Sequence, residues 1–233
     1  MTEPLPSNVH ASTHPCLQAK LSQLRAASTN ARETKALVHE IALILGVEAL
    51  AAGLATRKGQ DKITPLGFNY TTTEISPSTI SLIPILRSGL GMLDAIQTLL
   101  PNPVSVHHLG LFREPTTLEP VEYYNNLPYT RPTAGSPSNT PNTVASELAI
   151  LLDPVIATGG TCFAAIQTLR EWGGEAYHSA EWPEGTEIWV AGVDESVTDR
   201  GMIKPGLGDV GDRRFLKRCY LELVDISLEK ALD

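Results

Sequence analysis

The sequence predicts an α/β protein with an open, mainly parallel sheet that is flanked by helices and has a helical cap at its N-terminal end. Two short apolar runs, residues 79–86 and 148–152, are each followed by a polar or glycine-containing loop and then by a helical pattern. Strands that alternate with helices in this way form parallel sheets. Ligands of such sheets bind beyond the carboxyl ends of the strands, so we expect a site in these loops.

Composition and charge exclude several classes of protein. The 233 residues are 42% hydrophobic and 19% charged, which is typical of a soluble globular chain of one large or two small domains. The net charge of −8 argues against nucleic acid as a partner, because binding its phosphates needs a basic surface. The most apolar stretch, residues 41–55, contains Glu48, and we expect it to be too short and too polar to cross a membrane. The three widely separated cysteines favour reduced thiols and a cytoplasmic location, with the nucleus left open.

Apolar periodicity assigns the elements in order. Leucines at helical spacing predict one helix around residues 17–24 and a second around residues 37–45, and together they form the cap. The alternation that follows is strand 79–86, helix 90–100, strand 104–112, strand 148–152, helix 162–172 and strand 188–193. Residues 1–13 are expected to be a flexible start. The proline-rich, polar residues 115–141 predict an exposed loop, and we expect a mobile loop at about residues 126–144.

The loop after the strand 148–152 has the features of a phosphate site. Thr158, Gly159, Gly160 and Thr161 allow main-chain N–H groups to converge on an anion, because glycine permits close approach and positive φ. The helix that follows adds the partial positive charge of its N-terminus. Asp153, at the end of the strand, can accept hydrogen bonds from two sugar hydroxyls. The pattern therefore predicts a cradle for a ribose phosphate.

Other interpretations of this loop fit its sequence less well than the cradle. It is not a Walker A loop, because no Gly-Lys-Ser/Thr follows, and it lacks the Gly-x-Gly-x-x-Gly pattern of dinucleotide-binding loops. Thr-Gly-Gly-Thr could also be only a tight turn between a strand and a helix. The apolar strand and the acid that precede it favour the cradle.

Residues 153–161 resemble the diphosphoribosyl-binding loop of phosphoribosyltransferases, and the opening Asp153-Pro154 is similar to that of uracil phosphoribosyltransferases. Further blocks resemble the same family and occur in its order: His14-Pro15 and residues 84–92, 110–113, 117–124 and 205–213. The chain is identified as a member of this family over residues 14–215, with residues 216–233 as a C-terminal extension.

The resemblance implies a phosphoribosyltransferase-type fold and a pentosyl transfer. The expected reaction joins uracil and 5-phospho-α-D-ribose 1-diphosphate to give UMP and diphosphate, a step of pyrimidine salvage. The resemblance also implies Mg²⁺, bound through diphosphate and water, and a homodimer or higher homo-oligomer. Some members of the family are activated by GTP, so an allosteric GTP site is a further expectation.

The resemblance also assigns roles to individual residues. The catalytic residues would be Arg113, Asp153 and Asp209. The base would be recognised, largely through main-chain groups, by Ile203, Gly208, Asp209 and Val210. The diphosphoribose would be bound by Arg87, Arg113, Asp153, Pro154, Val155, Ile156, Ala157, Thr158, Gly159, Gly160, Thr161 and Asp209. Asp194 and Glu195 could suggest a further carboxylate pair, but we favour a structural or loop-ordering role, because the family does not use such a pair.

Two departures from the family bear on function. Met202 and Lys204 flank Ile203 where the family usually has tyrosine and an apolar residue, so an altered base choice is an expectation for this chain. Residues 173–186 contain no apolar strand, although the family has a strand and a helix here, so we expect this part of the core to be lacking. The alternative function is therefore a catalytically impaired paralogue or truncated isoform that binds nucleotide or diphosphoribose in a regulatory role.

Overall fold

The computed structural model describes residues 4–114, 117, 119–128, 146–173, 185–199 and 201–215. Its N-terminal part is the predicted pair of helices, α1 (Pro15–Arg25) and α2 (Ala31–Gly53). Asn30 begins α2 with a capping box, in which its side chain accepts the Glu33 N–H and the Glu33 carboxylate accepts the Asn30 N–H, both at 3.0 Å. The helical cap expected from the leucine spacing is confirmed.

The helix α2 is longer than its leucine pattern indicated. It has 23 residues and by length and composition alone is apolar enough to cross a membrane, but a helix that packs in a protein core has the same properties, so the expectation that residues 41–55 do not span a membrane is not overturned. Its apolar residues have another explanation in the fold. Leu37, Val38, Ile41 and Leu45 are buried against the leucines of α1, as expected for a helix that packs in a core.

The central sheet is mainly parallel, as predicted, and is organised around β4 (Ile80–Leu86). One edge of β4 pairs in parallel with β8 (Leu148–Leu152). The other edge pairs in parallel with β5 (Ser105–Val106) and then β6 (Leu109–Arg113), so the single strand predicted for residues 104–112 is in fact divided. An antiparallel strand, β7 (Pro120–Asn125), extends the sheet beyond β6 where we predicted only loop. Its side chains are mostly exposed, which is why its composition resembles a loop.

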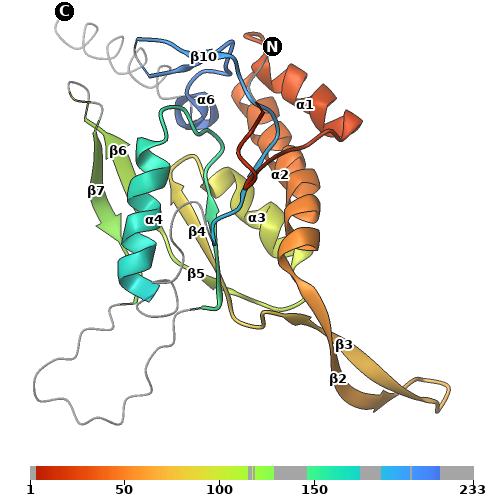
Figure 1. Ribbon diagram of the computed structural model, residues 1–233. Coiled ribbons are helices and arrows are strands. Elements are labelled where there is room, and N and C mark those ends of the chain that lie inside the picture. Colours follow the sequence, from red (N-terminus) through yellow and green to blue (C-terminus); the bar gives the residue numbers. More distant parts are fainter. Residues whose placement is uncertain are drawn as a thin grey trace, which may run out of the picture.

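Helices cover both faces of this sheet (Figure 1). Ile80 and Leu82 of β4 pack towards α2 and α3 (Leu90–Leu99), in a cluster with Ile96. Ile83 and Ile85 pack in the cluster that includes Ala165 and Leu169 of α4 (Gly160–Gly173). Since both faces are covered, β4 reads as a continuous apolar run instead of alternating with polar residues.

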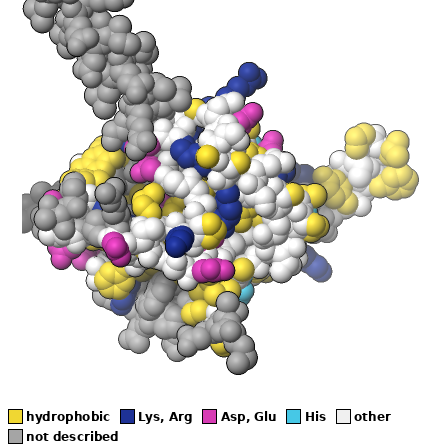
Figure 2. Space-filling model, turned by 90° about the horizontal axis from the view of Figure 1, so that it is seen from above, with side chains coloured by type: hydrophobic (Ala, Val, Ile, Leu, Met, Phe, Trp, Pro, Cys, Tyr) yellow, Lys and Arg dark blue, Asp and Glu magenta, His cyan; other side chains and the backbone are white. Residues whose placement is uncertain are grey.

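A long hairpin protrudes from the body of the protein (Figure 1). It consists of β2 (Ala55–Ile63) and β3 (Asn69–Ser76), which are antiparallel. Apolar side chains are exposed at its end, with Leu66 83% and Phe68 69% exposed. Figure 2 shows these hydrophobic side chains gathered at the end of the arm. We predicted no structure for this region from the sequence.

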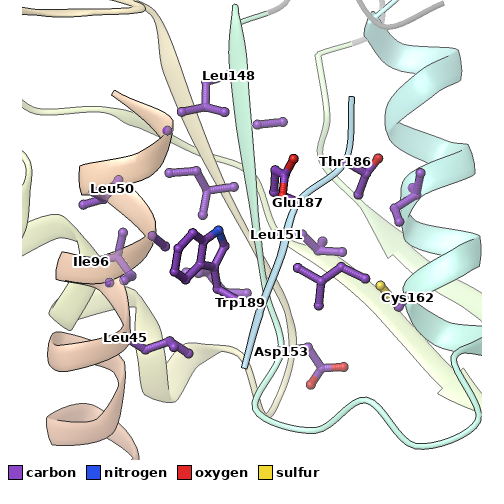
Figure 3. A pocket seen from close by; sticks show the side chains of 18 of the residues that line it. Leu45, Leu50, Ile96, Leu148, Leu151, Asp153, Cys162, Thr186, Glu187 and Trp189 are labelled. Carbon is purple, nitrogen blue, oxygen red and sulfur yellow. The ribbon is translucent and has the colours of Figure 1, made fainter. Parts of the chain in front are cut away.

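A second, two-stranded parallel sheet lies apart from the central one. It pairs β9 (Ile188–Val190) with β1 (Val9–Ala11), so part of the expected flexible start is a strand. Between β8 and β9 lies a cavity of about 860 Å³, lined by residues 148–153 on one side and 186–189 on the other (Figure 3). Among the described residues, no strand pairs with the edge of β8 that faces this cavity.

The backbone groups along this cavity support the expectation that a strand is lacking. Leu148 donates its N–H to Thr79, so alternate residues of β8, Ala149 and Leu151, turn their N–H and C=O groups away from β4. Likewise Ile188 and Val190 bond to β1, which turns the peptide groups of Trp189 away from β1. The central residues 174–184 of the predicted deletion lie outside the described part of the chain.

The last described elements follow β9. A short antiparallel pair, β10 (Ser196–Val197) and β11 (Ile203–Lys204), leads through residues 205–209 into α6 (Val210–Phe215). The helix α6 contacts α2. The C-terminal extension, residues 216–233, and residues 129–145 of the predicted mobile loop lie outside the described residues.

Candidate active site

The loops at the carboxyl ends of β4, β6 and β8 meet at one end of the sheet and carry most of the predicted site residues. Arg87 follows β4, Arg113 ends β6 and Asp153 follows β8. Electrostatic interactions with Arg113 and Asp209 both act on the carboxyl group of Asp153, so these groups share one site. Figure 2 looks onto this end of the molecule, where Lys and Arg side chains lie near the middle of the face with Asp and Glu side chains around them.

Asp153 is the most strongly perturbed acid of this site. Burial raises its pKa from 3.8 to about 6. The shift is limited by hydrogen bonds that favour the ionised form, from Ser88 Oγ at 3.0 Å and from the backbone of Val155, and by the charge of Arg113. At neutral pH the carboxyl group is therefore mostly ionised but poorly solvated, which suits an acceptor for sugar hydroxyls.

The loop after Asp153 has the backbone conformation of an anion cradle. Gly159 has a φ of +81°, and the following helix, α4, begins at Gly160. A Cβ atom at residue 159 would meet no atom within 4 Å, so the positive φ and not lack of space requires glycine here. Open space above a loop that ends in a helix N-terminus is the arrangement that binds phosphate.

The loop after β4 approaches β8 so closely that a second glycine is required. A Cβ atom at Gly89 would lie 2.2 Å from the carbonyl oxygen of Leu152 and 2.7 Å from the nitrogen of Ile85. Both are backbone atoms, which cannot move aside. This close approach brings Ser88 within hydrogen-bonding distance of Asp153.

Each of the two predicted arginines makes a long contact with the protein. Arg113 Nη1 donates to the carbonyl oxygen of Gly201 at 3.3 Å. Arg87 Nη2 lies 3.5 Å from Asp212 Oδ1, and both side chains of this pair are more than a third exposed. Long contacts contribute less energy than short ones, so neither contact prevents its guanidinium group from turning to an anionic ligand.

The loop of residues 203–210 has a constrained backbone. Gly206 and Gly208 have φ angles of +66° and +74°, and a Cβ atom at Gly206 would lie 2.1 Å from the carbonyl oxygen of Ile203. Val210 starts α6 and is buried, so its side chain belongs to the core and only its main chain can face a ligand. Asp209 Oδ1 accepts the N–H of Asp212 at 2.8 Å, which caps α6.

The structure also identifies residues that sequence reasoning missed. Ser88 donates to Asp153, and its place directly after Arg87 in the loop beyond β4 could have drawn attention to it. Arg25 contacts the backbone of the loop 203–210 from a distant part of the chain, and Arg213 contacts it from α6, the helix that follows the loop; no sequence signal indicates the contact of Arg25. Among the described residues, no group of three or more His, Cys, Asp or Glu side chains could hold a metal ion by itself.

Comparison with known proteins identifies one family. A family model described as uracil phosphoribosyltransferase matches residues 11–180 and 176–216. The two matched segments meet where we expected a strand and a helix to be lacking. The chain is also similar to proteins named uracil phosphoribosyltransferase from Thermoanaerobacter sp. (strain X514), with 37% identity, and from Roseiflexus castenholzii, with 38%. Each similarity covers 89% of this chain and 97% of the relative.

The extent of these similarities agrees with the expectation that this chain lacks a segment near residues 173–186. The similarity to the Thermoanaerobacter protein runs over 221 residues, which is more than 89% of 233, so that relative has residues without a counterpart here. A solved structure of a protein from Aquifex aeolicus has the same fold, with a TM-score of 0.73 and 28% identity over 89% of this chain and 97% of that one.

Proposed function

The chain belongs to the uracil phosphoribosyltransferase family, and we propose that it transfers the 5-phosphoribosyl group of 5-phospho-α-D-ribose 1-diphosphate to uracil, giving UMP and diphosphate. The observation that supports this most is the constellation around Asp153. An acid for the ribose hydroxyls, a glycine loop at a helix N-terminus and Arg113 come together at one end of the sheet.

The proposed reaction breaks the bond from ribose C1 to the diphosphate oxygen and forms a bond from C1 to uracil N1, which loses its proton. Its main demands are alignment of the two substrates and stabilisation of the departing charge. Asp153 would fix the ribose, the loop 153–161 its 5-phosphate, and Arg87 and Arg113 the diphosphate. Guanidinium groups suit this role because they are permanently charged and match phosphate oxygens in geometry.

Magnesium is part of the proposal and fits the residues of the site. Asp153 and Asp209 are close enough for the charge of Asp209 to raise the pKa of Asp153. Two carboxylates without a third ligand fit an ion held mainly by diphosphate oxygens and water, with Asp209 as the contact through water. When bound, Mg²⁺ supplies neutralising charge for the diphosphate. Activation by GTP and a cytoplasmic location stay predictions.

The comparisons support the transferase and not the second candidate function, binding without catalysis, so that alternative rests only on the cavity beside β8. Among the described residues, no strand pairs with this edge of β8, which directly precedes Asp153, so an incomplete sheet could impair the catalytic loop. An assay distinguishes catalysis from binding alone. The purified chain is incubated with Mg²⁺, the diphosphoribose and either uracil or cytosine, and the products are separated. We expect UMP and diphosphate in equal amounts from uracil. Diphosphoribose binding by folded protein without nucleotide formation would establish the second candidate.

The protruding hairpin supports the proposal of a homo-oligomer. Its end exposes Ile63, Leu66, Phe68 and Tyr70, and exposed apolar patches of this kind mark contact surfaces. We propose that a second copy of the chain covers them. Light scattering of the wild type and of a Phe68→Ser variant tests this: a wild-type monomer, or an unchanged oligomer in the variant, would contradict it.

A further inference from the structure

Two charged side chains from distant parts of the chain form an ion pair beside the proposed uracil-binding loop. Arg25 is the last residue of α1, and Asp194 lies after β9. Both Nη atoms of Arg25 donate to the carboxylate of Asp194, with Nη1 2.9 Å from Oδ2. The Asp194 side chain is only 6% exposed, and the hydrogen bonds from Arg25 lower its pKa. The pair is thus bidentate, ionised and largely shielded from water.

Both members of the pair also hold Gly206. Asp194 Oδ2 accepts the N–H of Gly206 at 2.9 Å, and Arg25 Nη1 donates to the carbonyl oxygen of Gly206, also at 2.9 Å. Gly206 is the residue whose positive φ and contact with Ile203 turn the loop. The ion pair therefore fixes the peptide groups on both sides of the tightest turn of this loop.

The position of Gly206 connects this contact to the base. Gly206 lies between Ile203 and Gly208, whose main-chain groups are the proposed partners of uracil. Hydrogen bonds from a backbone to a planar base depend on the orientation of each peptide group. We infer that Arg25 and Asp194 are positioning residues, which act through Gly206 to set the affinity of the enzyme for uracil. This inference rests on the proposed function.

Hydrogen bonds from Arg213 also hold this loop, and they allow the positioning role of the ion pair to be distinguished from a role in folding. Arg213 Nη1 donates to the carbonyl oxygens of Leu207, at 2.7 Å, and of Leu24, at 2.6 Å. Leu207 is itself buried in the core with α1 and α2. These contacts remain when the ion pair is lost, so the loop should change its orientation at Gly206 without unfolding. Of the residues assigned to the diphosphoribose, Arg87, Arg113 and Asp153 come from other elements. Asp209 lies in the loop, but it has a contact of its own with the N–H of Asp212, which does not involve the ion pair.

The test compares uracil with the diphosphoribose in an Asp194→Asn variant, which keeps the size of the side chain and removes its charge. We expect KM for uracil to rise about tenfold, because a buried N–H and a guanidinium group lose a charged partner. KM for the diphosphoribose should change less than twofold. Arg25→Lys keeps the positive charge but loses the bidentate geometry of the guanidinium group, and should raise KM for uracil in the same way.

A matched control is provided by Lys20 and Glu40, an ion pair between α1 and α2 that does not contact the loop. Glu40→Gln makes the same chemical change as Asp194→Asn and should leave both KM values unchanged. The inference would be wrong if uracil KM is unchanged in folded Asp194→Asn and Arg25→Lys, or if both KM values rise together. The latter result would indicate a merely structural role.

Hydrogen exchange tests the same contact without relying on activity. The amide of Gly206 should exchange faster in Asp194→Asn than in the wild type, whereas amides of β8 should not change. Unchanged exchange at Gly206 would overturn the inference. If the wild type forms no UMP, the proposed function fails, but the inference can still be tested by measuring uracil binding in equilibrium dialysis. Binding of uracil should weaken about tenfold in Asp194→Asn. Equal binding by the variant and the wild type would refute the positioning role.

Discussion

Replacing Asp153 by asparagine should stabilise the protein while it inactivates the enzyme. Burial raises the pKa of Asp153 from 3.8 to about 6, so the folded protein holds a proton that the unfolded chain releases over this range. Folding stability due to this group therefore falls as the pH rises from about 4 to about 6 and is constant above. The pKa change corresponds to a cost of about 3 kcal/mol at pH 8. Asparagine resembles the protonated acid and does not carry this cost.

The measurement is urea unfolding of Asp153→Asn and the wild type at several pH values. The difference in unfolding free energy should grow in favour of the variant by about 2 kcal/mol between pH 4.5 and pH 8, with most of the change below pH 6.5. Taking the difference cancels the other titrating groups, which both proteins share. Asp61→Asn, at an exposed acid of the hairpin, is the control for the chemical change itself.

Activity gives the second half of this prediction. In Asp153→Asn, kcat/KM should fall about 100-fold, or about 2.7 kcal/mol, because a neutral amide is a weaker acceptor for the ribose hydroxyls. A stability difference that stays flat between pH 4.5 and pH 8 would refute the argument that burial perturbs this acid. Unchanged kinetics would remove Asp153 from its proposed role.

Three further predictions follow from other parts of the structure. Arg113→Ala should lower kcat at least tenfold with little change in the urea midpoint, since the hydrogen bond of this side chain to Gly201 is long, at 3.3 Å; unchanged kcat would exclude Arg113 from the reaction. Gly89→Ala should cost about 1–3 kcal/mol in urea unfolding, because its Cβ would collide with backbone, whereas Gly53→Ala, with no atom within 4 Å, should be neutral or slightly stabilising; equal effects would contradict the close approach of β4 and β8. The cavity between β8 and β9 should bind the fluorescent apolar dye anilinonaphthalene sulfonate. Ala49→Phe, in the cavity wall, should reduce the dye signal, and Ala51→Phe, outside the wall, should not; equal signals would place the dye elsewhere.

The parts of the fold that were predictable from sequence are those with strong apolar patterns. The runs that became β4 and β8 are apolar and β-branched, and each precedes a loop of unusual composition, so the site at the ends of these strands could be predicted. The hairpin of β2 and β3 was missed, because its residues are polar and mostly exposed. The strand β7 was missed for the same reason, since an edge strand with exposed side chains resembles a loop.

Contacts between residues that are far apart in the chain could not be predicted from the sequence. Arg25 and Asp194 are 169 positions apart, and only the fold brings them to Gly206. The raised pKa of Asp153 also depends on burial, which a loop sequence does not reveal. By contrast, the lack of an apolar strand in residues 173–186 was visible in the sequence, and the cavity beside β8 agrees with it.

The most direct test of the account is whether the wild-type chain, despite this cavity, forms UMP. Radiolabelled uracil, the diphosphoribose and Mg²⁺ are incubated with purified protein whose folded state is verified by circular dichroism, and labelled UMP is measured over time. The account predicts UMP formation that is linear in enzyme concentration and strongly reduced in Asp153→Asn. Folded wild-type protein that binds the diphosphoribose but yields no labelled UMP would contradict it.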